Sequence, residues 1–349
     1  MKGMWSNLRA DAALRELEAL TRAGLDVIEL HSQTLSVLKR VVPFDGACFG
    51  AVDPDTLLLT SGVTIGFEPS DAESERFVEI EYSGIDPNSF GSLVARKVPV
   101  LADGGGFAPN RRLDVRYNEL GKLIGFAHET RMTFTVDGLC WAVGDLYRSD
   151  RSDDFDGREL LFLETAGQHI AAATRAATND SSVQIGVAPV GAAVLIIDAD
   201  GGINGMTDVA KQWIDALDPD HVARLGFAVR AAVAVARRGV PTAFTRLRIG
   251  GTWTVVRASS LQAGSDRASV AVTIDQASPA DLTQLRMAAH GISPRERDVC
   301  LEVLAGRSTQ EIADHLFIAA HTVQDHLKSI FAKTGVRSRR ELVAAFGAS

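Results

Sequence analysis

The stretch STQEIADHLFIAAHTVQDHLKSIFAKTG, residues 308–335, has the pattern of two short helices separated by a tight turn. In its second half, apolar side chains recur at helical spacing and form one stripe: Val323, Leu327, Ile330 and Phe331. The sequence predicts that this stripe packs on apolar residues of the preceding helices: Ile312, Leu316, Val299, Val303 and Leu304. The opposite face of the second helix carries polar residues: His321, Gln324, Asp325 and Lys328.

Three helix starts in this region share the signal Ser-x-x-Glu, at residues 293–296, 308–311 and 338–341. The serine hydroxyl can accept from the backbone three residues on, and the glutamate can reach back to the helix start. Gly306 and Gly335 fall where helices should stop. The sequence therefore predicts an all-α four-helix domain over residues 280–349.

A helix pair with an outward polar face has the size and shape to enter the major groove of DNA. Lys328 can reach a phosphate or a guanine edge, and Gln324 can pair with adenine. The backbone N–H groups at Ser308 and Thr309 can hold a phosphate. The pattern also fits a small bundle that docks on another protein, so the residues alone leave both interpretations open.

Residues 292–346 resemble the LuxR-type helix-turn-helix domain of bacterial transcription regulators. The matching positions are Ser293-Pro294-Arg295-Glu296, Gly306, Glu311-Ile312-Ala313, Leu316, Ile318, Thr322-Val323, His326, Lys333, Gly335-Val336 and Ser338-Arg339. The resemblance implies that outward positions of the second helix read bases and that flanking positions hold the DNA backbone. The expected DNA contacts are Ser308, Thr309, Thr322, Gln324, Asp325, His326, Lys328, Lys333 and Arg337.

Three positions depart from that family pattern. Ala319 stands where a serine cap is usual, Gln324 where a lysine is common, and Thr334 where a leucine is usual. A lysine lost at position 324 removes one phosphate or guanine contact, and Asp325 repels phosphate unless it accepts from a cytosine amine. We therefore expect weak affinity or an unusual sequence preference.

Charge is distributed unevenly along the chain of 349 residues, whose net charge is −8. An acidic balance by itself argues against nucleic acid as a partner. From residue 291 onward, however, eight Lys and Arg residues stand against seven Asp and Glu residues. A C-terminal part that is not acidic, on an otherwise acidic chain, fits a partner specific to that part.

The remainder of the chain predicts α+β sensory domains. After an N-terminal helix in residues 1–20, residues 21–176 show a helix, short strands and a second helix from Asp156. The strand-like runs are ACFGAV from 47, TLLLTSGVT from 56, VPVLA from 98, and MTFTVDGLCWAVGDLYR from 132, the last with an Asp137-Gly138 turn signal. LADGGGFAP at 101–109 reads as a loop, and ATNDSSVQIGVAP at 177–189 as a linker.

Residues 21–176 resemble a GAF-type sensory domain, a curved sheet that often encloses a small-molecule pocket. The residues that carry the resemblance are Arg116-Tyr117, Gly125-Phe126, Glu129-Thr130-Arg131, Trp141, Leu146-Tyr147-Arg148 and Phe155. Residues 190–276 are similar to a PAS domain: two strands around Asp200-Gly201-Gly202, two helices, and three strands with turns at Gly250-Gly251 and QAGSD.

A ligand pocket in the GAF-like domain is a hypothesis that rests on its aromatic residues. The tentative lining residues are Phe49, Phe90, Phe126, Phe134 and Trp141. Aromatic residues at such positions also serve as plain core, so both interpretations stand. The sequence does not identify the effector.

Chemistry-bearing motifs are absent from the sequence. It contains no HExxH or GxSxG, and no nucleophile, base and oxyanion site assemble, so we do not expect an enzyme. Cys48, Cys140 and Cys300 form no CxxC pair; a Cys48–Cys140 redox pair is an alternative to small buried residues. We expect no metal or other cofactor, no membrane-spanning segment, and a cytoplasmic protein.

These observations predict a transcription regulator that binds double-stranded DNA as a homodimer, at a palindromic or pseudopalindromic operator. A small-molecule signal in the GAF-like or PAS-like domain would control it, and a contact with RNA polymerase is conceivable. The alternative is a sensory adaptor that acts on the transcription machinery by protein contacts, without binding DNA.

Overall fold

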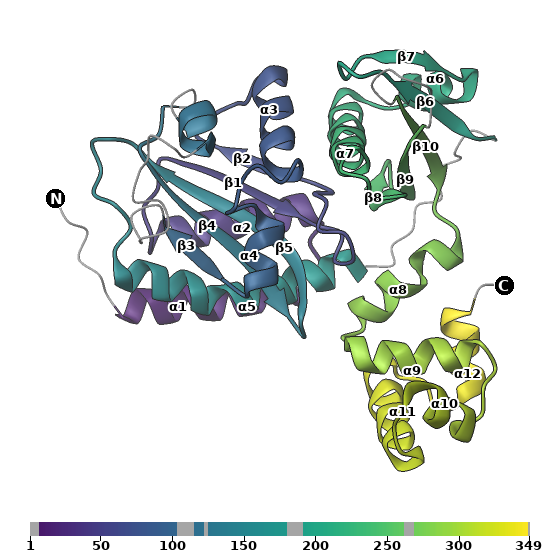
Figure 1. Cartoon of the computed structure of the whole chain (residues 1–349). Coiled ribbons are helices and arrows are strands. Elements are labelled where there is room, and N and C mark those ends of the chain that lie inside the picture. Colours follow the sequence, from purple (N-terminus) through teal and green to yellow (C-terminus); the bar gives the residue numbers. More distant parts are fainter. Residues whose placement is uncertain (1–6, 103–114, 122–124, 180–190, 262–268, 348–349) are drawn as a thin grey trace. The chain divides into compact units, whose positions relative to one another are not determined.

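The computed structural model describes residues 7–102, 115–121, 125–179, 191–261 and 269–347 (Figure 1). The chain divides into two compact units, one formed by residues 1–136 and 140–276 and the other by 137–139 and 277–349. The predicted Gly-rich loop, the linker and the QAGSD turn fall wholly or mostly outside the described residues.

The larger unit holds two five-stranded antiparallel sheets. The first has the order β2-β1-β5-β4-β3, with bounds β1 Gly46–Ala51, β2 Val63–Ile65, β3 Val100–Ala102, β4 His128–Val136 and β5 Leu139–Arg148. Asp137 and Gly138 both adopt positive φ, 52° and 78°, as a tight Asp-Gly hairpin turn requires. The predicted hairpin between β4 and β5 is confirmed.

The first hairpin differs from its prediction. The run from residue 56 was expected to pair with β1 directly, but β2 begins at Val63. Residues 53–58 instead form a loop in which Leu57 has a φ of 60°. In β1, Cys48 lies opposite Asp145 of β5, and all three cysteines are free.

Three helices cover one face of the first sheet: α1 Asn7–Leu20, α2 Val27–Lys39 and α5 Gly157–Asn179 (Figure 1). Their apolar faces close on a core that contains Phe49 of β1 and Met132 and Phe134 of β4. These helices follow the periodicity of the sequence, with a break between α1 and α2.

The opposite face of the first sheet carries elements that the periodicity did not indicate. They are α3 Asp71–Tyr82, α4 Phe90–Arg96 and a π-helical turn, η2 Tyr117–Gly121. Ser70 caps α3 in a reciprocal capping box with Glu73. The start signal used above for the C-terminal helices is therefore present here as well.

The second sheet has the order β7-β6-β10-β9-β8. Its elements are β6 Ala193–Ile197, β7 Ile203–Met206, α6 Asp208–Asp215, α7 Pro219–Arg237, β8 Ala243–Ile249, β9 Thr252–Ser260 and β10 Val270–Gln276. This is the predicted succession of two strands, two helices and three strands. Alanines of α7 and aliphatic residues of the strands share one core.

The smaller unit is helical: α8 Pro279–Ala289, α9 Pro294–Leu304, α10 Thr309–Leu316, α11 Ala320–Thr334 and α12 Arg339–Phe346. Val323, Leu327 and Ile330 are buried in one cluster with Val299 and Ile312, so the predicted packing of the stripe is confirmed. Ser293 and Ser308 form full capping boxes. Ser338 caps α12 by accepting from the Glu341 N–H.

Candidate functional site

The turn between α10 and α11 is short and closes on Phe317. This residue ends α10 in the left-handed conformation, with φ 54°, and its side chain is 93% exposed. The next N–H, of Ile318, donates to Ala313 O at 3.0 Å. Because Ile312 and Val323 are buried in the same cluster, α10 and α11 are held as one rigid pair.

The outer face of α11 carries three exposed side chains: Gln324, Asp325 and Lys328. Lys328 Nζ lies 3.3 Å from Asp325 Oδ1, and the two side chains are 78% and 67% exposed. An ion pair this exposed contributes little to stability, about 0–1 kcal/mol. The Lys328 ammonium is therefore readily available to another anion. Thr322 and His326 are partly buried beside this face.

Lys333 differs from Lys328 because its ammonium has a partly buried partner. Its Nζ donates to Glu296 Oε2 at 2.6 Å, and Ser329 Oγ donates to Glu296 Oε1 at 2.6 Å. Burial raises the pKa of Glu296, but the hydrogen bonds from Lys333, Ser329 and Ser293 outweigh burial and lower the pKa to about 2. The Glu296 carboxylate thus ties α11 to the start of α9.

The start of α10 is exposed at Ser308, whose hydroxyl and Glu311 form the capping box. Arg339 of α12 donates to Thr309 Oγ1 at 2.8 Å and to Arg307 O at 2.9 Å. The Arg337 N–H donates to Glu341 Oε2 at 2.8 Å. The expected contacts at Ser308, Thr309 and Arg337 therefore lie at helix starts that side chains of the domain already fix.

The N-terminus of α11 lacks a side-chain cap. Ala319 at the N-cap makes no side-chain hydrogen bond, and the first turn of the helix contains no acidic residue. This agrees with the departure noted in the sequence, where the usual serine is missing. The first backbone N–H groups of α11 thus receive no serine, threonine or carboxylate oxygen at the N-cap.

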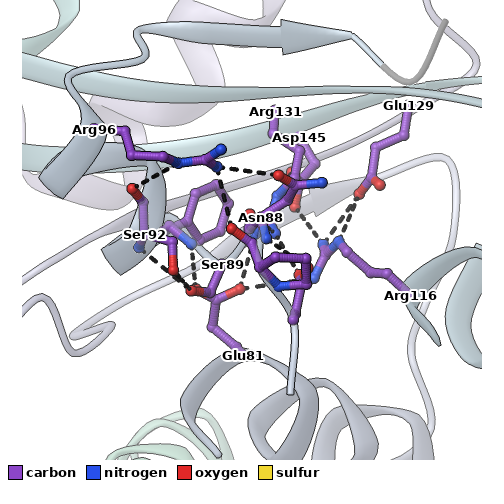
Figure 2. Close-up of polar contacts among 12 residues, drawn as sticks. Glu81, Asn88, Ser89, Ser92, Arg96, Arg116, Glu129, Arg131 and Asp145 are labelled. Atoms are coloured by element: carbon purple, nitrogen blue, oxygen red, sulfur yellow. Dashed lines mark hydrogen bonds and ion pairs between the residues drawn. The ribbon is translucent and has the colours of Figure 1, made fainter. Parts of the chain in front are cut away.

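A second group of polar residues lies in the larger unit, on the face of the first sheet opposite α1, α2 and α5 (Figure 2). Arg131 of β4, which is 3% exposed, is its centre. Its guanidinium donates to Glu81 at 2.9 Å, Asp86 at 3.1 Å and Asp145 at 3.1 Å. The same guanidinium lies 3.8 Å from the centroid of the Phe90 ring.

Arg116 completes this buried charge network, which consists of Glu81, Asp86, Arg116, Glu129, Arg131 and Asp145. Its Nη2 donates to Glu129 at 3.0 Å and to Asp145 at 3.1 Å. Burial raises the pKa of Asp145 to about 6, against the opposing effect of the two guanidiniums. With four carboxylates and two guanidiniums, the network holds more potential negative than positive charge.

The five aromatic residues predicted to line a pocket do not gather in one place. Phe49 and Phe134 contact each other in the core beneath the helices, with ring centroids 5.1 Å apart. Phe90 lies in a different cluster, with Leu93 and Val143. Phe126 stacks on Tyr147 at 5.1 Å, and Trp141 is 1% exposed.

The residues of the buried charge network were not identified as a site from the sequence. A signal for them exists, because Glu129 and Arg131 alternate within the strand run of β4 and Asp145 interrupts an apolar run in β5. A charged residue inside a run with strand periodicity, on the side that faces the protein, must find a buried partner. Within the described residues, no group of three or more His, Cys, Asp or Glu side chains could hold a metal ion.

The geometry of the smaller unit is that of a helix-turn-helix domain. One face of its second helix is buried against the first helix, and the other face presents polar side chains outward. No described helix is long and apolar enough to cross a membrane.

Comparison with known proteins places this domain in a family. Residues 290–346 match the family described as "Bacterial regulatory proteins, luxR family". The spore germination protein GerE of Bacillus subtilis is 36% identical over 52 residues, which are 15% of this chain and 70% of GerE. The chain therefore belongs to the luxR family of bacterial regulatory proteins.

Other relatives are much longer than the matched region. A Mycobacterium tuberculosis protein named "Putative HTH-type transcriptional regulator Rv0890c" is 46% identical over 52 residues, 15% of this chain and 6% of its own length. The crystal structure of Escherichia coli SdiA aligns with 97% of this chain and 98% of SdiA, at 11% identity and a TM-score of 0.38. The mycobacterial match thus concerns the helix-turn-helix domain alone.

Proposed function

We propose that the protein is a DNA-binding transcription regulator in which α11 enters the major groove. The observation that supports this most directly is the exposed polar face of α11, on a helix fixed from behind by Val323, Leu327 and Ile330. Gln324, Asp325 and Lys328 would meet base edges. The other proposed contacts are Ser308, Thr309, Thr322, His326, Lys333 and Arg337.

The structure ranks these contacts by the freedom of each side chain. Lys328 is held by an exposed pair alone, so it can bind phosphate or guanine at small cost. Lys333 would have to share its ammonium with Glu296, or leave it, to contact DNA. We therefore propose Lys328 as the principal cationic contact and Lys333 as a residue that mainly positions α11.

The regulator would act as a homodimer on a palindromic operator with half-sites about one helical turn apart. A small-molecule effector in the larger unit would shift the dimer between two arrangements. Membership of the luxR family and the presence of two sheet domains ahead of the helix-turn-helix support this proposal. A cytoplasmic location and a contact with RNA polymerase belong to the same proposal.

Titration of operator-containing DNA with the full chain over a salt series tests this function. The sequence upstream of the protein's own coding region is the first DNA to use. Binding should weaken steeply with salt, and Lys328→Ala should reduce the slope of log K against log salt by about 0.9. Lys211→Ala, an exposed lysine on α6, is the control and should leave the slope unchanged.

A second candidate function is an adaptor that docks on protein through the same helix pair. The Asp325–Lys328 pair favours it, because an acidic side chain on the recognition face repels phosphate. Binding to a protein of the transcription machinery that survives high salt, with no DNA binding at low salt, would select this function over the first.

A further inference from the structure

The loop that follows β1 presents two carboxylates in fixed directions. Asp53 is 2% exposed, and its backbone N–H donates to Leu58 O at 2.9 Å. The Asp55 N–H donates to Asp53 Oδ1 at 3.1 Å, and Leu57 has a φ of 60°. These hydrogen bonds hold both carboxylates away from solvent and towards the second sheet of the same unit.

Arg246 of β8 receives both carboxylates. Its Nε donates to Asp53 Oδ2 at 2.8 Å, and its Nη2 donates to Asp53 Oδ1 and Asp55 Oδ2, each at 2.5 Å. The side chain of Arg246 is 3% exposed and that of Asp53 is fully buried. Two-toothed arginine–carboxylate pairs of this kind fix relative orientation as well as distance.

The same carboxylate also satisfies backbone at the edge of the second sheet. The Arg246 N–H donates to Asp53 Oδ2 at 3.0 Å. Among the described strands, β8 pairs with β9 alone and so forms an edge. A side chain of the first sheet domain thus takes the place that a neighbouring strand would have at the edge of the second.

Apolar residues surround this contact. Leu58, Val78 and Tyr82 of the first sheet domain are buried in one cluster with the strands of the second sheet and α7. The rings of Phe77 on α3 and Phe227 on α7 lie 6.1 Å apart. Burial of this kind on both sides of an ion pair excludes water and makes the pair costly to break.

Helix α3 faces the second sheet domain with one side and the buried charge network with the other. Glu81, which is 4% exposed, accepts from Arg131 Nη2 at 2.9 Å and from the Phe90 N–H at 2.6 Å. The Arg116 guanidinium lies 5.4 Å from the centroid of the Phe77 ring. A change in the partners of Glu81 must therefore move Phe77 and Tyr82 against α7.

We propose that the two sheet domains act as one sensory body, with α3 as the shared element and the Arg246–Asp53–Asp55 cluster as its lock. A signal received by either sheet would then change both, in contrast to two sensors that work separately on a tether. The inference concerns the larger unit and is independent of whether the helix-turn-helix binds DNA.

Hydrogen exchange of the full chain, followed by mass spectrometry at increasing urea concentrations, tests the proposal. Peptides from β4–β5 and from β9–β10 report the two sheets. If they form one cooperative body, their exchange should converge on a single opening event as urea rises. Two opening events that stay separate at all urea concentrations in the unmodified protein would overturn the proposal.

Variants show whether the lock produces the coupling. Arg246→Met should separate the two sets of peptides, with β9–β10 opening at lower urea than β4–β5. Asp55→Asn removes the outer carboxylate alone and should cause a smaller separation, which covers the case in which Arg246→Met does not fold. Arg257→Met is the matched control, because Arg257 pairs with Asp275 within the second sheet, at 3.8 Å. If Arg246→Met and Asp55→Asn leave the sets as coupled as Arg257→Met does, the cluster is not the lock.

Discussion

The buried charge network of the first sheet and the outer face of α11 are both rich in charge, yet they differ in every physical respect. In the network, Arg131 is 3% exposed and reaches three carboxylates. On α11, Lys328 is 78% exposed and has one loosely held partner, Asp325. The first arrangement stabilises a single conformation of the protein, whereas the second leaves a cation ready to exchange its partner.

The comparison teaches that residue type alone does not separate structural charge from functional charge. Lys328 and Lys333 lie five positions apart on one helix, and the sequence assigns both to DNA. The structure gives Lys333 to Glu296, a carboxylate that is 8% exposed. What separates the two lysines is the burial of the partner, because burial sets the cost of losing it.

The largest expected effect comes from breaking the network at its centre. Arg131→Met removes the cation shared by Glu81, Asp86 and Asp145, and leaves buried carboxylates without compensation. The free energy of unfolding should fall by about 3–5 kcal/mol, measured by urea denaturation. Arg158→Met, at an exposed position on α5, should change it by less than about 0.5 kcal/mol. A loss for Arg131→Met as small as that of the control would show that the network contributes nothing to stability.

The pH dependence of the smaller unit should show how firmly Glu296 is held. Its pKa is lowered from 4.5 to about 2 in the folded protein, so folding favours the ionised form. The resulting stability, about 3 kcal/mol, is fully present above pH 4.5 and is lost as the pH falls towards 2. Urea denaturation followed by circular dichroism from pH 7 to pH 2.5 measures it.

Glu296→Gln should abolish this part of the acid destabilisation, because glutamine has no proton to gain. Lys333→Met should reproduce at pH 7 part of the loss that the unmodified protein shows in acid. A Glu296→Gln protein with an unchanged pH profile would mean that the carboxylate is not held as described.

The recognition face should respond in the opposite direction to the loss of a charge. Asp325→Asn removes a phosphate-repelling group and releases Lys328, so DNA affinity should rise several-fold, by up to about 1 kcal/mol. Stability should hardly change. Asp298→Asn is the control, because Asp298 forms a similar exposed pair with Arg295 on α9, at 3.5 Å. Weaker binding by Asp325→Asn would indicate that Asp325 accepts from a base.

The smallest effect is expected at the turn between α10 and α11. Phe317 holds a positive φ of 54° and buries almost none of its side chain, so glycine should suit the position better. Phe317→Gly should raise the free energy of unfolding by about 0.5 kcal/mol. A marked loss of stability in thermal denaturation would contradict the exposure seen here.

The smaller unit was predictable from sequence because its signals are local. Each Ser-x-x-Glu start needs contacts within four residues, and the stripe on α11 faces one core. The Asp-Gly hairpin of β4 and β5 and the order of elements around the second sheet were predictable for the same reason. Lys333 was misjudged as a plain DNA contact, because its partner lies on another helix, 37 positions away.

Helix α3 was missed for a different reason. It packs on both sides, with Val78 and Tyr82 in the core of the second sheet and Glu81 in the buried charge network. A helix buried on two sides shows no single apolar stripe, and a buried glutamate further hides the period. The aromatic pocket failed to gather for a related reason: aromatic character predicts burial but not the face of the sheet.

The distance along the chain between Asp53 and Arg246, 193 positions, has a consequence for the order of folding. Contacts between distant residues form late, because the entropy of closing a long loop must be overcome first. The capped helices at the C-terminus need no such closure and can form within microseconds. The part of the protein that is synthesised last can therefore complete its structure before the two sheets, synthesised first, have joined.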